Sequence, residues 1–256
     1  MDTLKPILIT LFCAFLVFSC QKHGNVEIQF TQTVDDKPVQ TGQLIYLNAA
    51  GNLYQVDEVK YFVSRILLKS TSGKTLEITQ DNGIHYVDNG ISKTLRWLLS
   101  EIPQGEYSAI SFVFGLDEED NKSNRFVNPP ECNFSWPEVL GGGYHYMQIN
   151  GKFLNNNGDL QNMNIHTGIG QIRGADNEIL QFVHNYFRVT LPVHFSVMES
   201  NTTLITLNME IQRWFDSPNL YNFNDFGPGI MQNQQAQQIL KENGKNVFEV
   251  MINGFL

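Results

Sequence analysis

Three side chains in the middle of the chain have the types and spacing of a soft-metal site. His145 and Met147 are two residues apart in a segment with strand-like alternation, so both side chains are expected on one face. Neutral imidazole and thioether groups are soft enough to bind Cu(I), and His166 could complete a three-ligand site. The structural alternative is that Met147 fills the core and that His145 and His166 are ordinary hydrogen-bonded residues, His166 with Asn164 or Thr167.

A second group of side chains could bind a harder cation. Asp117, Glu118, Glu119, Asp120 and Asn121 follow a predicted strand, and this density of oxygen ligands could hold Ca²⁺. Their spacing differs from that of an EF-hand loop, which alternates its ligands and places a glycine at the sharp turn. A solvated acidic loop is therefore the interpretation that we favour.

Motifs of common enzyme classes do not occur in the chain. It has no Gly-x-Ser-x-Gly elbow, no His-Glu-x-x-His, no phosphate-binding glycine loop and no Cys-x-x-Cys-His. The glycines at 141–143 indicate a tight turn, since no helical pattern follows them. His85, His184 and His194 have no paired ligand nearby in the sequence, which favours structural roles. We therefore expect a protein that binds without turnover rather than an enzyme.

The N-terminal segment has the pattern of a bacterial lipoprotein signal peptide. Lys5 precedes an apolar run over 7–18, which is shorter than the roughly 20 residues of a membrane-spanning helix. Ser19 before Cys20 is typical of a lipobox, so residues 1–19 are predicted to be removed and Cys20 to carry the lipid. An uncleaved signal anchor and a cleaved signal without lipid are the alternatives. This pattern predicts attachment to a membrane of the bacterial cell envelope, on its periplasmic or cell-surface face.

Charge and cysteine content limit the partners and the source of stability. The formal net charge of −9 disfavours binding to nucleic acid or to anionic lipid. With Cys20 lipidated, Cys132 is the only remaining cysteine, so no intramolecular disulfide can form. The Cys132 thiolate would suit copper, although an isolated cysteine usually packs as a small hydrophobe. Stability must come from an aromatic-rich core.

Short segments rich in β-branched and aromatic residues recur between turn signals, which predicts an antiparallel β-sandwich. Val26, Ile28 and Phe30 alternate with polar residues in the pattern of a half-buried strand. Residues 155–159 are turn formers. The predicted strands are Asn25 to Val34, Val59 to Ser70, Tyr107 to Leu116, Tyr144 to Leu154, Phe182 to Met198 and Leu204 to Trp214.

Helical patterns are few and short. One covers Ser92 to Ser100, with leucines at one-face spacing, and the other covers Ile230 to Glu242 before an Asn-Gly pair. Neither repeats nor a change in composition divide the chain after the signal. We therefore expect residues 20–256 to form a single mainly β domain with a short N-terminal tether and a long loop from Asp216 to Gly229.

The order of several sequence blocks resembles that of the MbnP-like family, the copper-binding partner proteins of the methanobactin system. The resemblance covers roughly residues 25 to 215, and the shared order of the blocks is what carries it. The blocks are Tyr61-Phe62-Val63-Ser64, Ile102-Pro103-Gln104-Gly105-Glu106-Tyr107, Ile110-Ser111-Phe112-Val113-Phe114-Gly115-Leu116-Asp117, Phe134-Ser135-Trp136-Pro137, Gly141-Gly142-Gly143-Tyr144-His145-Tyr146-Met147 and Ile165-His166-Thr167-Gly168.

This resemblance implies a β-rich envelope protein that binds copper, in some members through histidines and a tryptophan oxidised to kynurenine by a partner dihaem, peroxidase-like enzyme. By position, Trp136 would be that tryptophan and His166 a histidine of the following strand. The structural alternative is that Trp136 is an aromatic side chain that packs under a loop. Copper-binding members carry a histidine two residues after the tryptophan, where this chain has Glu138. A carboxylate is a harder ligand, so Glu138 would move the preference towards Cu(II) or Zn²⁺.

Three hypotheses of function follow. The first is an exported lipoprotein that binds a metal, copper by resemblance, at His145, Met147, His166, Trp136 and Glu138. The second is a surface interaction or ligand-binding module without metal, in which aromatic residues and the Asp216 to Gly229 loop recognise a protein or glycan. The third, which we place last, is an unrecognised hydrolase. The spatial separation of His145, Met147, His166 and Trp136 discriminates between the first two: a close cluster favours metal binding, and dispersal favours the interaction module.

Overall fold

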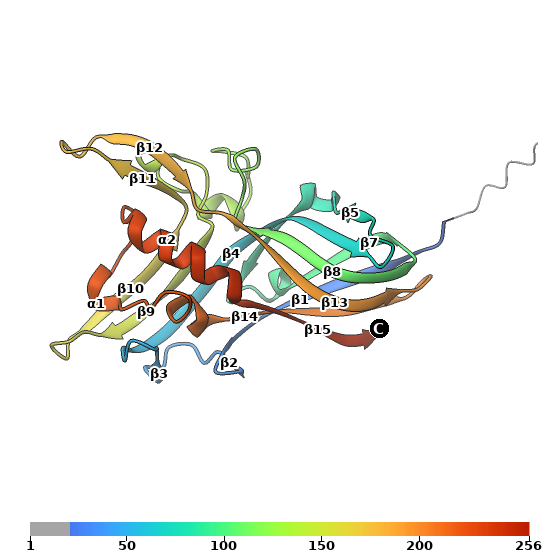
Figure 1. The fold of residues 1–256 in the computed structure, drawn as a ribbon, viewed down its shortest axis with the longest axis horizontal. Helices are drawn as coiled ribbons and strands as arrows, with labels where there is room; N and C mark the ends of the chain where they lie inside the picture. The colour runs from blue at the N-terminus through green and yellow to red at the C-terminus, as the bar shows by residue number, and fades with distance from the viewer. Residues whose placement is uncertain (1–20, 256) are drawn as a thin grey trace, which may run out of the picture.

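The strands of this chain form two large sheets and one separate hairpin (Figure 1). The computed structural model describes residues 21–255, so Cys20 and the predicted signal segment lie outside the described part. The first sheet has β1 at its centre and consists of β15 (Phe248–Phe255), β14 (Thr202–Glu210), β1 (His23–Val34), β2 (Lys37–Pro38) and β7 (Arg96–Pro103).

The second sheet is built around one long strand, β4. Its main path runs through β10 (Leu160–Thr167), β9 (Met147–Leu154), β4 (Leu53–Ser70), β8 (Gly105–Phe114) and β13 (Phe187–Val197). Three short strands pair with β4 outside this path, namely β3 (Tyr46–Leu47), β5 (Thr75–Glu77) and β6 (Ile84–Asp88). The hairpin of β11 (Ile169–Arg173) and β12 (Ile179–His184) projects from the body at the end opposite to the start of β1 (Figure 1).

Helices are short and lie between or beside the strands. The α-helices are α1 (Phe223–Phe226) and α2 (Gln234–Asn243), and each begins with an asparagine cap whose side chain accepts a hydrogen bond from a backbone N–H. The 3₁₀ helices are η1 (Gln80–Gly83), η2 (Ser92–Leu95), η3 (Glu131–Phe134), η4 (Glu138–Leu140), η5 (Ile211–Phe215) and η6 (Gly244–Asn246). The predicted class, mainly β with a few short helices, is confirmed.

Alternation along the strands decides which face is buried. In β1 the burial alternates at every residue, with Val26, Ile28 and Phe30 at most 1 % exposed. Their side chains pack in a main core shared by both sheets, and the buried face of each sheet is thereby removed from water. Most strand pairs are antiparallel, but β1 and β14 pair in parallel, with Ile28 opposite Ile205.

A second, smaller cluster of aromatic residues lies apart from the main core. It contains Phe62, Phe134, Trp136, Tyr144 and Tyr146, all at most 2 % exposed. Phe62 makes edge-to-face contacts with Phe134 and Tyr144. This cluster positions the segment from Phe134 to Tyr146, on which three of the five candidate site residues lie, namely Trp136, Glu138 and His145.

Several predicted elements differ from those observed. The predicted strand from Leu204 to Trp214 ends with β14 at Glu210, where η5 follows, and the predicted loop from Asp216 to Gly229 contains α1. The segment from Ser92 to Ser100 is not one helix, because after η2 it continues as β7, in which Trp97 and Leu99 are buried and Leu98 is 45 % exposed. Pairing with β1 over Ile28↔Trp97 stabilises the extended form. Phe182 to Met198 is likewise divided between β12 and β13, which lie in different sheets.

None of the helices within residues 21–255 is both long enough and apolar enough to cross a membrane.

Candidate metal centre

Three segments of the chain lie side by side at the candidate site, two of them close in sequence and the third further along. The N–H of Trp136 donates to the Gly143 carbonyl at 2.8 Å, and the N–H of His145 donates to the Phe134 carbonyl at 2.9 Å. On the other side, the N–H of Tyr146 donates to the Thr167 carbonyl at 2.8 Å. These bonds fix the backbone of 134–136, 143–146 and 166–168 as neighbours, so that side chains from each segment converge.

The converging side chains are Trp136, His145 and His166. The ring centroids of Trp136 and His145 are 4.8 Å apart at an interplanar angle of 81°. Those of His145 and His166 are 5.2 Å apart, also at 81°. Trp136 and His145 are 2 % and 6 % exposed, whereas His166 is half-buried. Three of the five predicted site residues therefore form one cluster.

The hydrogen bonds of His145 define which ring nitrogen is free. Its Nδ1 lies 3.1 Å from the Phe134 carbonyl oxygen, which can only accept, so Nδ1 carries the proton. Nε2 then has an unprotonated lone pair. This atom is buried and finds no hydrogen-bond partner within residues 21–255. A backbone carbonyl that holds one imidazole nitrogen while the other binds metal is the usual arrangement of a metal-ligating histidine.

A relay of polar side chains defines the tautomer of His166 in the same way. The carboxylate of Glu58 accepts from Asn150 Nδ2 at 2.9 Å and contacts Lys60 Nζ at 3.1 Å. The Asn150 amide oxygen therefore faces His166, and the 2.7 Å contact to His166 Nε2 places the proton on that nitrogen. Nδ1 of His166 is left as the metal-competent atom.

Both imidazoles are neutral near pH 7. Burial lowers the pKa of His145 to about 4. Burial, together with the nearby His145 and Lys60, also lowers the pKa of His166 to about 4. Because only a neutral imidazole binds metal, protons compete weakly with a metal ion at this pair.

The indole of Trp136 is fixed between a carbonyl and a glycine. Its Nε1 donates to the Leu140 carbonyl at 3.2 Å, which satisfies its donor. A Cβ on Gly168 would fall 2.7 Å from two carbons of the ring, so only glycine allows this close approach. Gly168, two residues after His166, therefore allows the packing of Trp136.

The structure places the other two candidates differently. Met147 is fully buried and packs in the main core, whereas Trp136 belongs to the second aromatic cluster. Glu138 is exposed in η4, and its carboxylate lies against Gly142. No hydrogen bond or ion pair between described residues joins Glu138 to His145 or His166.

Sequence and structure both resemble those of a known protein family. The family model for MbnP matches residues 23–232. The chain belongs to the MbnP family. A solved structure of MbnP from Methylosinus trichosporium superposes with a TM-score of 0.58 at 17 % identity, covering 91 % of this chain and 100 % of that one. That similarity extends the shared fold over nearly the whole domain. No curated protein matches the sequence significantly.

In this member of the MbnP family, a hollow of about 470 Å³ opens beside His166, whereas His145 does not line it. It is lined by Asn150, Asn164, His166, Gly229, Ile230, Met231 and Gln232. Sequence reasoning missed Asn150 and the segment from Gly229 to Gln232, because they approach His166 only through the fold. The Gly-Pro-Gly run before Ile230 was the one signal that the chain turns there.

The remaining histidines have different surroundings. His85 is stacked between Phe30 and Trp97, with centroid distances of 5.1 and 4.9 Å, and its Nε2 contacts the Thr94 carbonyl. His184 Nε2 lies 3.8 Å from Glu118, and His194 is exposed. Within residues 21–255, no group of three or more histidine, cysteine or carboxylate side chains is arranged to hold a metal ion.

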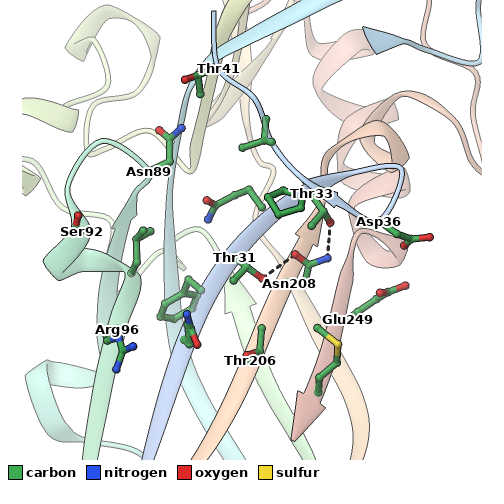
Figure 2. Close-up of a pocket in the computed structure, with 17 residues that line it drawn as sticks. Thr31, Thr33, Asp36, Thr41, Asn89, Ser92, Arg96, Thr206, Asn208 and Glu249 are labelled. Carbon is green, nitrogen blue, oxygen red and sulfur yellow. Dashed lines mark hydrogen bonds between the residues drawn. The ribbon is translucent and has the colours of Figure 1, made fainter. Parts of the chain in front are cut away.

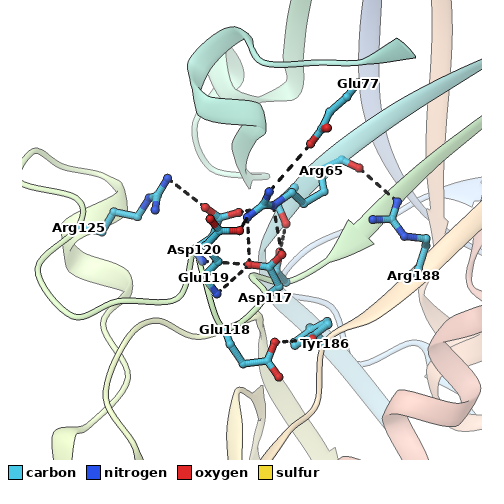
Figure 3. A network of polar contacts seen from close by, with 11 residues as sticks. Arg65, Glu77, Asp117, Glu118, Glu119, Asp120, Arg125, Tyr186 and Arg188 are labelled. Atoms are coloured by element: carbon cyan, nitrogen blue, oxygen red, sulfur yellow. Dashed lines mark hydrogen bonds and ion pairs between the residues drawn. The ribbon is translucent and has the colours of Figure 1, made fainter. Parts of the chain in front are cut away.

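The acidic stretch after β8 is bound by arginines (Figure 3). Arg65 Nε lies 2.7 Å from Asp120 and 3.1 Å from Asp117, and its Nη2 lies 2.7 Å from Glu119. Arg125 contacts the other oxygen of Asp120 at 3.1 Å. The stretch is thus part of a partly buried ion-pair network. Arg65, at the centre of this network, lies in β4 and has a left-handed backbone conformation with φ of 51°.

Proposed function

We propose that this member of the MbnP family binds one copper ion at His145 and His166, beside Trp136, and performs no turnover. The observation that carries the proposal is the buried Nε2 of His145, which has no hydrogen-bond partner among residues 21–255. The His145 ring meets that of His166 edge to face. A buried acceptor without a partner is costly, and a bound metal ion would remove that cost. Neutral imidazoles with fixed second nitrogens are suitable ligands.

Trp136 is the residue on which a partner would act. We propose that a dihaem, peroxidase-like enzyme oxidises the indole to kynurenine, as the family resemblance implies. The contact of 4.8 Å between the Trp136 and His145 rings supports a role in the same site, because an aromatic amine formed there would adjoin the histidine pair.

We further propose that the protein acts in the bacterial cell envelope, anchored by a lipid on Cys20. The apolar run and the Ser19-Cys20 junction support this part of the proposal. A lipid-anchored copper protein outside the cytoplasm would hold the metal where it enters or leaves the cell.

Copper titration tests the proposal. Apoprotein is titrated separately with Cu(I) and Cu(II) against a competing chelator, and the wild type is expected to bind one copper ion. His166→Ala should abolish uptake and His145→Ala should weaken it, while the circular dichroism of both variants stays that of a β protein. His194→Ala, at an exposed histidine, is the matched control. Unchanged uptake in His166→Ala, or no stoichiometric uptake by the wild type, would contradict the proposal.

Intact mass of protein purified from its native envelope tests the modification separately. A mass shift that corresponds to kynurenine and maps to the peptide of Trp136 is expected, and Trp136→Phe should lack it. An unmodified Trp136 in protein that binds copper would remove the partner enzyme from the proposal but leave the histidine pair.

A groove on the first sheet favours a second candidate function, the binding of a polar ligand (Figure 2). Its floor is a ladder in which Thr31 donates to Asn208 at 2.8 Å and Asn208 donates to Thr33 at 2.6 Å. Arg96 lies on one side, and Asp36 and Glu249 on the other (Figure 2). Hydroxyl and amide groups that line a hollow of about 800 Å³ suit a glycan or an extended peptide.

Glycan and peptide arrays probed with the apoprotein test this candidate. Binding that Asn208→Ala abolishes and His166→Ala leaves unchanged would establish the groove as a separate site. Binding that survives Asn208→Ala would exclude it.

A further inference from the structure

The loop before α2 is held against the strand that carries His166. The N–H of Asn164 donates to the Pro228 carbonyl at 3.0 Å, and Asn164 forms a parallel bridge with Gly229. The two segments run in the same direction from this bridge. His166 lies two residues after Asn164, and Met231 lies two residues after Gly229. The parallel bridge therefore makes Met231 a neighbour of His166.

The backbone of Met231 is fixed from the side of α2. Gln237, which is fully buried, donates from Nε2 to the Met231 carbonyl at 3.0 Å and accepts from the Gly168 N–H at 3.0 Å. One side chain thus ties Met231 to the residue on which Trp136 packs. The side-chain amide of Gln237 therefore fixes the Met231 backbone relative to Gly168 and the site.

The side chain of Met231 borders both parts of the candidate centre. It is half-buried, it packs against the aromatic cluster that contains Trp136, and it lines the same hollow as His166. Met231 and His166 therefore line one hollow, and the Met231 side chain also reaches the cluster that holds Trp136.

We propose that Met231 is a metal ligand that completes the His145–His166 pair and makes the site selective for Cu(I). This inference rests on the copper site proposed above. A thioether is a soft donor that suits Cu(I) better than Cu(II) or Zn²⁺. Two imidazoles and a thioether form a neutral ligand set, and a monovalent ion costs less than a divalent ion to bury without a counter-charge. Met231 takes the place that the sequence assigned to Met147 and Glu138.

The affinities of Met231→Leu for different metals test the proposal. Leucine conserves volume and apolar character, so the variant is expected to fold. Cu(I) affinity should fall by at least about tenfold, the order of loss seen when a metal site is perturbed. Zn²⁺ and Cu(II) affinities should change little. Met251→Leu is the matched control, because Met251 is 49 % exposed on β15, in the other sheet.

Protection of methionine from oxidation gives a second readout. The full chain is treated with dilute hydrogen peroxide with and without Ag(I), a redox-inert analogue of Cu(I), and sulfoxides are mapped by mass spectrometry. Ag(I) should protect Met231 and leave Met251 unprotected.

The outcomes separate this inference from the function on which it rests. Normal Cu(I) affinity in Met231→Leu, with loss in His166→Ala, would overturn the role of Met231 and leave the histidine site intact. Wild-type protein that prefers Cu(II) or Zn²⁺, or equal oxidation of Met231 with and without Ag(I), would overturn it as well. Uptake of no metal at all would overturn both.

Discussion

The indole of Trp136 lies directly on Gly168, so closely that a Cβ at position 168 would fall 2.7 Å from its ring carbons. Gly168→Ala is therefore expected to displace the indole or its neighbours and to lower the free energy of unfolding by about 1–3 kcal/mol, the usual cost of overpacking. Denaturant unfolding measures the loss, and tryptophan fluorescence reports the displaced ring. Gly229→Ala is the control, because a Cβ there meets nothing within 4 Å. Equal stability of both variants and the wild type would contradict the prediction.

Acidification should destabilise the apoprotein through the same histidine pair. The pKa of each is about 4 in the folded state and about 6.5 in a solvated chain, so the unfolded state binds more protons between these values. The stabilisation is complete above pH 6.5 and is lost as the pH falls towards 4. We expect the free energy of unfolding to drop by roughly 2–4 kcal/mol between pH 7 and pH 5 from these two residues.

The double variant His145→Asn/His166→Gln is the control for this pH dependence. Asparagine and glutamine keep a donor near the positions of Nδ1 and Nε2 but do not titrate. The variant should retain only the pH dependence of other groups, among them His85, whose pKa burial also lowers. A slope equal to that of the wild type would show that the pair does not titrate as described.

The arginine network should matter for stability, and calcium should not. Arg65→Gln leaves the buried carboxylate of Asp120 with Arg125 as its remaining ion-pair partner, and we expect a loss of about 1–3 kcal/mol. Arg96→Gln breaks an exposed pair with Glu27 and should cost less than about 1 kcal/mol. Thermal unfolding with and without Ca²⁺ should coincide, because Arg65 and Arg125 already pair with three of the four carboxylates of the acidic stretch. A large calcium-dependent rise in Tm would favour an ion site there.

Membrane attachment should depend on Cys20. The variant Cys20→Ser is expected either to appear in the soluble envelope fraction or to remain unprocessed, since the thiol is the atom that would carry the lipid. Fractionation and intact mass distinguish these products. A processed Cys20→Ser protein that stays in the membrane fraction would refute the lipoprotein interpretation.

Local patterns in the sequence predicted the fold where one strand face is buried and the other is not. The alternation of Val26, Ile28 and Phe30 with polar residues is visible in the sequence, because an apolar residue recurs at every second position. The helix predicted for 92–100 was wrong, because Leu95, Leu98 and Leu99 fit one face of a helix as well as they fit a strand. Pairing with β1 decides that case, and pairing is a property of two segments.

The site was only partly predictable for a related reason. Trp136 was found by resemblance, His145 by residue type and spacing, and His166 by both, and the three lie together. Met231 carries no local signal, because its relation to His166 depends on one bridge between Asn164 and Gly229. The parallel pairing of β1 with β14 was missed in the same way, since it joins opposite ends of the chain.

The position of β1 has a consequence for how the proposed copper site would be oriented at a membrane. With a lipid on Cys20, only Gln21 and Lys22 would separate the bilayer from the first residue of β1, an extended length of about 10 Å. So short a tether would leave the domain little freedom to turn over, with the β1 end at the lipid surface. The end that carries β10 and the β11–β12 hairpin would face the aqueous compartment (Figure 1). A soluble copper carrier could then reach the opening at His166, whereas a transporter embedded in the same membrane would need a shuttle between them.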